Sequence, residues 1–156
     1  MLQYLILQLC DTSTSYCHYS NEHTTRRLIP IDVLEKAVLW AMKENLMMQV
    51  VRPAYALPQE YEEVLDRMEH TDIVPASSPL VDKAEIVVLN QWDELREFHF
   101  LHDSSYVIRT NKMAFFEHYR DLVPILPQVE RMNVVITDVA DFEEKDFGVY
   151  QKVLQY

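Results

Sequence analysis

The chain has 156 residues, of which 49% are hydrophobic and 25% are charged, as expected for a globular domain. Its only glycine is Gly148, which excludes glycine-rich phosphate loops and dinucleotide fingerprints, because both need several residues without a Cβ atom. The formal net charge of -11 makes nucleic acids and anionic membrane surfaces poor partners, whereas a neutral or cationic peptide is compatible with it.

The sequence also predicts where the protein is found. No apolar run reaches the ~18–20 residues of a membrane-spanning helix. The start of the chain, Met1–Cys10, lacks the basic region and the small-residue cleavage site of a signal peptide. Since two cysteines without a secretory signal are typical of a reducing compartment, we expect a cytoplasmic protein with reduced thiols.

The first half of the chain alternates strands and helices. Tyr4–Cys10 is an apolar run short enough for a buried strand, and the polar segment 11–25 predicts a loop after it. Pro30 marks the start of a helix at 31–45, whose apolar residues recur at the helical period. The further elements expected in this half are a strand at 47–51, a helix at 58–69 and a strand at 72–75.

The second half repeats this rhythm. An amphipathic helix is expected from Asn111 onwards, and Pro124 and Pro127 should kink or end it. Asp141 can cap a last helix that runs to Tyr156. The other elements expected here are strands at 85–89, 106–109 and 134–136 and a short helix at 91–98.

Six strands that alternate with about five helices predict a parallel sheet, because each parallel pair needs a crossover connection. We expect one α/β domain over residues 1–156, arranged as an open (β/α)6 partial barrel, with a flat doubly wound sheet as the alternative. Because the chain stops inside a predicted helix, we expect it to be the N-terminal part of a longer protein.

The loop after the first strand carries the most informative motif. Cys10, Thr14 and Cys17 follow the spacing C-x3-C-x2-C, except that the middle position is a threonine, and Tyr16 precedes the last cysteine. Such loops lie at the carboxyl ends of parallel strands, where these sheets place their ligands.

This motif resembles that of radical S-adenosylmethionine enzymes. The first strand, the segment Arg26–Pro30 and the segment Met42–Leu46 are similar to the N-terminal region of CXXX-repeat peptide maturases, and the similarity spans essentially all 156 residues. Where radical S-adenosylmethionine enzymes usually have a Gly-Gly-Glu-Pro stretch that holds the cofactor's amino group, this chain reads Val51-Arg52-Pro53-Ala54. The resemblance implies a (β/α)6 barrel that modifies small cysteine-repeat peptides.

The departures from the family pattern imply a degenerate site. An iron–sulfur cluster needs thiolate ligands, and the hydroxyl of Thr14 is neutral and hard. We therefore expect no cofactor, with Cys10 and Cys17 as the remnant of a cluster site. The resemblance implies that the peptide contacts lie around the same pocket, with the candidates Tyr16, His18, Asn21 and Arg52.

Three functions follow as hypotheses. The first is a domain that binds or scaffolds a cysteine-repeat precursor peptide without catalysing alone. The second is an iron–sulfur peptide-modifying enzyme that is active only in the full-length protein. The third is a structural domain that uses an exposed apolar face to form, for example, a homodimer.

Other polar clusters are weaker candidates. Cys10 and Cys17 with His18 and His23 form a C-x6-C-H-x4-H set, although zinc ligand pairs are normally two to four residues apart. His99, His102 and Asp103 resemble a metal-site fragment or a base with its orienting carboxylate. Six methionines predict either core filling or a promiscuous peptide groove; they are Met42, Met47, Met48, Met68, Met113 and Met132.

Overall fold

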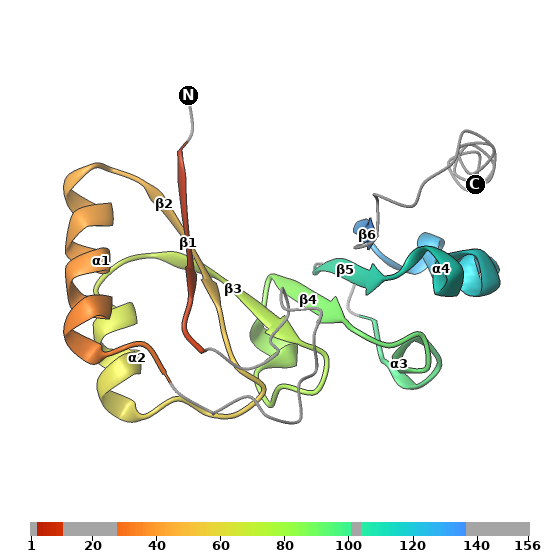
Figure 1. Cartoon of the computed structure of the whole chain (residues 1–156), viewed down its shortest axis with the longest axis horizontal. Helices are drawn as coiled ribbons and strands as arrows, with labels where there is room; N and C mark the ends of the chain where they lie inside the picture. Colours follow the sequence, from red (N-terminus) through yellow and green to blue (C-terminus); the bar gives the residue numbers. More distant parts are fainter. Residues whose placement is uncertain (1–2, 11–27, 101–103, 137–156) are drawn as a thin grey trace. The chain divides into compact units, whose positions relative to one another are not determined.

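The computed structural model describes residues 3–10, 28–100 and 104–136. They form an α/β fold whose six parallel strands lie in chain order, β1-β2-β3-β4-β5-β6 (Figure 1). In a doubly wound sheet the strand order reverses part-way. The open (β/α)6 partial-barrel topology is therefore confirmed, and the doubly wound alternative is wrong. Two compact units divide the chain; unit 1 comprises residues 1–87 and unit 2 residues 88–156.

Unit 1 alternates strands with helices. Its elements are β1 (Tyr4–Gln8), α1 (Ile31–Lys43), β2 (Met47–Val51), α2 (Gln59–Leu65), β3 (His70–Pro75), the 3-10 turn η1 (Val81–Lys83) and the start of β4 (Ile86–Leu89). β1 pairs with β2, and β2 with β3, in parallel. Pro30 and Pro58, each with φ of -58°, stand at the N-caps of α1 and α2, because this fixed angle leads directly into a helix.

The core of unit 1 lies between the sheet and its two helices, which Figure 1 shows on the same side of β1, β2 and β3. Leu7 and Val50 are neighbours across β1 and β2 and point toward these helices. Leu34, Val38 and Ala41 form the buried stripe of α1 at helical spacing. The buried core cluster consists of Leu9, Leu34, Val38, Met48, Val50, Tyr61, Val64 and Leu65.

Unit 2 has an aromatic core. Its elements are the end of β4, α3 (Glu94–Glu97), β5 (Ser105–Thr110), α4 (Lys112–His118), the 3-10 turns η2 (Tyr119–Leu122) and η3 (Leu126–Gln128), and β6 (Arg131–Ile136). β5 and β6 pair in parallel. Tyr106 is fully buried, and its ring packs edge-on against Phe98 and Phe100, with centroids 5.8 and 4.9 Å away.

Several predicted boundaries differ from those in the structure. The first strand ends at Gln8, and Cys10 instead forms an isolated antiparallel bridge with Leu28. The helix expected at 91–98 shortens to Glu94–Glu97, because the carboxylate of Glu94 accepts the N–H groups of Asn90 and Gln91 in a turn. The helix expected at 141–156 lies outside the described residues.

Candidate functional site

Within the described part of unit 1, both helices lie on one face of the sheet, and no helix of this unit covers the other face (Figure 1). Successive side chains of a strand point to opposite faces, and the helices cover the face of Leu7 and Val50. On the opposite face, Tyr4, Ile6 and Met47 are 51, 55 and 45% exposed. Tyr4 and Met47 are also direct neighbours across β1 and β2. We call Tyr4, Ile6 and Met47 the apolar face.

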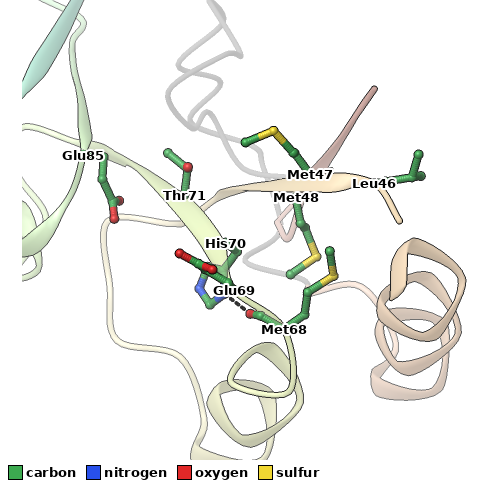
Figure 2. A pocket seen from close by; sticks show the side chains of 8 residues that line it. All are labelled: Leu46, Met47, Met48, Met68, Glu69, His70, Thr71 and Glu85. Atoms are coloured by element: carbon green, nitrogen blue, oxygen red, sulfur yellow. Dashed lines mark hydrogen bonds between the residues drawn. The ribbon is translucent and has the colours of Figure 1, made fainter. Parts of the chain in front are cut away.

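A pocket of about 340 Å³ adjoins the apolar face at the amino-terminal ends of β2 and β3. Figure 2 shows Met47 and Thr71 on one side of these strands and Met48 and His70 on the other. The lining combines apolar side chains and thioethers with two carboxylates, and it consists of Leu46, Met47, Met48, Met68, Glu69, His70, Thr71 and Glu85. Such a lining suits a segment that is apolar and carries a positive charge.

His70 is the only imidazole in this lining, and both of its ring nitrogens have partners. Nδ1 lies 2.9 Å from the carbonyl oxygen of Met68, a hydrogen bond drawn in Figure 2, and Nε2 lies 3.3 Å from Oδ1 of Asp72. The hydrogen bond to Asp72 raises the pKa of His70 above its ordinary 6.5, although burial acts in the opposite direction. With both ring nitrogens engaged, His70 is better suited to act as a charged imidazolium that positions Asp72 than to act as a free general base.

Asp72 joins His70 to a buried arginine. Nε of Arg52 donates to Oδ1 of Asp72 at 2.6 Å, and Nη1 of Arg52 donates to Oε1 of Glu62 at 2.7 Å. The Arg52 side chain is only 5% exposed. Burial alone would raise the pKa of Asp72, but the hydrogen bonds and positive charges of His70 and Arg52 lower it below 3.8.

This ion network ties three elements together. Arg52 directly follows β2, Glu62 lies on α2, and both His70 and Asp72 belong to β3. Burial opposes the charge of Arg52, yet its two carboxylate partners raise its pKa above the ordinary value. The network therefore fixes α2 against the sheet and holds the pocket wall formed by His70 in place.

The structure places only two of the residues predicted for the cofactor and peptide site. Cys10 is 2% exposed, just beyond the carboxyl end of β1, and its Sγ lies 3.3 Å from the hydroxyl of Tyr55. Arg52 makes the structural contacts given above, and its binding of substrate stays a prediction. The other residues of the motif and its surroundings lie outside the described residues; they are Thr14, Tyr16, Cys17, His18 and Asn21.

The remaining histidine candidates do not assemble a metal site in the described part of the chain. No group of three or more His, Cys, Asp or Glu residues with metal-binding geometry occurs there. His99 is described, whereas His23, His102 and Asp103 lie outside the described residues. In unit 2, His118 stacks on Trp92 with ring centroids 5.6 Å apart, and its Nδ1 lies 3.4 Å from Asp121.

The sequence motif predicted a site at the carboxyl ends of the strands, whereas the pocket lies at the amino-terminal ends of β2 and β3. The signal that pointed to it was the group of methionines, since Met47, Met48 and Met68 all line the pocket. The apolar face had no such signal, because Tyr4 and Ile6 alternate with Leu5 and Leu7 in an uninterrupted apolar run.

No protein-family model, no curated protein and no solved structure matches this chain. Among the helices in the described ranges, none combines the length and apolar character needed to cross a bilayer. The site offers apolar contact area, two pocket carboxylates and an exposed sheet face, which are features of binding.

Proposed function

We propose that this domain belongs to a peptide-maturation system and binds a cysteine-repeat precursor peptide on the apolar face of unit 1, in the cytoplasm. The observation that carries the proposal is the exposure of Tyr4, Ile6 and Met47, at 51, 55 and 45%, on one face of the sheet. Large apolar side chains gathered on a rigid sheet are typical of interaction surfaces.

The charge of the site selects among peptides. Glu69 and Glu85 line the pocket next to Met47, and the whole chain carries a net charge of -11. A neutral or basic peptide is therefore attracted, and its basic side chains can reach the pocket carboxylates while apolar side chains cover Tyr4 and Ile6. An acidic peptide of the same length is expected to bind more weakly.

A binding titration tests this proposal. The probe is a fluorescein-labelled synthetic peptide of CXXX repeats with lysine among the X positions and alkylated thiols. We expect saturable binding in fluorescence anisotropy. The substitution Met47→Ser removes apolar contact from the site and should cost about 1 kcal/mol, or roughly fivefold in Kd.

Met42→Ser is the matched control, because Met42 on α1 is 48% exposed but lies outside the apolar face. It should leave the Kd unchanged. The proposal fails if the peptide shows no saturable binding, or if the Met42 and Met47 variants weaken it equally.

A second candidate function rests on Cys10, which lies just beyond the carboxyl end of β1, where the resemblance requires a cluster ligand. In this case the protein would carry an iron–sulfur cluster for peptide modification. Anaerobic reconstitution followed by iron determination separates the two functions. The binding domain predicts no iron retained after desalting, whereas about four irons per chain would favour the enzyme.

A further inference from the structure

β1 is an edge strand whose outer side is unpaired among the described residues. The N–H of Met47 donates to the carbonyl of Gln3, and the N–H of Leu9 donates to that of Val51. Odd-numbered residues of β1 therefore direct their backbone groups toward β2. The even-numbered residues Tyr4, Ile6 and Gln8 direct their N–H and C=O groups outward, which leaves six groups for another strand.

Within residues 1–10, this edge lacks the sequence features that usually protect against pairing. Natural edge strands carry charged residues, proline or bulges that block the approach of another strand. Residues 1–10 contain no Lys, Arg, Asp, Glu or Pro. The β1 edge is therefore suited to accept a partner strand.

An exposed apolar stripe on α1 lies on the same side of unit 1 as this edge. Val33, Ala37 and Trp40 recur at helical spacing, and Val33 and Trp40 are 47 and 51% exposed. On the far side of the buried stripe, Glu35 contacts Arg67, which follows α2, at 3.2 Å. The stripe formed by Val33, Ala37 and Trp40 therefore points away from α2, toward the β1 edge.

We propose that two copies of this chain associate through antiparallel pairing of β1 with β1, with Ile6 opposite the partner's Ile6 on a twofold axis. Tyr4 then pairs with the partner's Gln8, and all six outward backbone groups form hydrogen bonds across the interface. The twofold axis is perpendicular to the sheet, so that both α1 helices lie on the same side and face each other with their apolar stripes.

The spacing of the elements fits this arrangement. α1 packs over both β1 and β2, because Leu34 and Val38 share a core with Leu7 and Val50. The α1 axis therefore lies about one strand spacing, ~4.8 Å, from the proposed twofold axis. The two helix axes come to lie about 10 Å apart, the separation at which helices pack.

A second copy fits this surface better than a peptide. A single added strand would satisfy the β1 edge but leave Val33 and Trp40 exposed, whereas a second copy covers both features at once. The association does not depend on the proposed peptide binding, and it places two apolar faces side by side on one continuous sheet.

The effect of salt distinguishes a second copy of the chain from a basic peptide as the partner of the β1 edge. Each copy carries a net charge of -11, so that salt should strengthen the dimer by screening the repulsion between copies. Binding of a basic peptide at the same edge would instead weaken as salt rises.

Sedimentation equilibrium of the whole chain tests the proposal. We expect twice the chain mass of 18.5 kDa, with a dissociation constant that decreases between 50 mM and 500 mM NaCl. Ile6→Lys places a charge at the centre of the interface, and Trp40→Glu places one in the helix contact. Each should raise the dissociation constant by more than about tenfold.

Leu39→Glu is the matched control, because Leu39 is 57% exposed on α1 but lies outside the stripe. It should remain dimeric, and circular dichroism should show all three variants folded. The proposal is overturned if the wild-type chain is monomeric or if its dimer weakens as salt rises. It is also overturned if Leu39→Glu raises the dissociation constant as much as Trp40→Glu does.

Discussion

Replacing Arg52 by methionine removes the cation at the centre of the network that joins β2, α2 and β3. The substitution leaves the carboxylates of Asp72 and Glu62 without their arginine partner. Breaking a fully buried ion pair costs ~3–5 kcal/mol. Here the Asp72 and Glu62 side chains are 24 and 35% exposed, so water compensates part of the loss, and we expect about 2–3 kcal/mol.

Urea unfolding followed by circular dichroism measures this loss, and thermal unfolding gives a second estimate. For a domain of this size, about 2–4 °C per kcal/mol predicts a decrease in Tm of roughly 4–12 °C. Arg67→Met is the matched control, because Arg67 pairs with Glu35 at 3.2 Å but both side chains are more than two-fifths exposed. That surface pair should contribute no more than about 0.5 kcal/mol.

The reasoning is refuted if the Arg52 and Arg67 variants lose the same stability. A double-mutant cycle with Asp72→Asn sharpens the test. Once Arg52 is replaced, neutralising Asp72 should cost less than it does in the wild type, because the carboxylate no longer has its arginine partner. Equal costs in both backgrounds would show that the two side chains do not interact.

Two further predictions concern His70 and Asn111. Because the pKa of His70 is raised in the folded protein, its contribution to stability is fully present below its unfolded value of 6.5 and is lost as pH rises through the folded value. The stability difference between wild type and His70→Gln, from urea unfolding at several pH values, should shrink over that range; a difference independent of pH would contradict the assignment. Asn111 caps α4 by accepting the N–H of Ala114 at 2.8 Å, so Asn111→Ala should cost about 1 kcal/mol in urea unfolding and Asn111→Asp much less. Equal losses in both variants would show that the cap contributes nothing.

The sequence was a good guide to the order and type of the elements, because local signals set them. Pro30 and Pro58 marked the starts of α1 and α2 through their fixed φ. β3 began earlier than expected, at His70, because His70 and Thr71 do not look like part of a strand until the partner of His70 is known. That partner is Asp72, which is in turn bound by Arg52, 20 residues before it in the sequence.

The candidate site was harder to predict for the same reason. The exposure of Tyr4 and Ile6 depends on which face of the sheet α1 and α2 cover, and an apolar run such as Tyr4–Cys10 does not contain that information. The pocket depends on the register that places Met48 beside His70. Short-range patterns determine elements, whereas register determines which of their side chains meet.

The most direct test of the account is site-specific photo-crosslinking with p-benzoylphenylalanine introduced separately at positions 4 and 40. Tyr4 and Trp40 are both 51% exposed, but Tyr4 belongs to the apolar face and Trp40 to α1. The account predicts that the CXXX-repeat peptide is captured from position 4, and that position 40 captures only a second copy of the chain. Capture of the peptide from position 40 and not from position 4 would contradict it.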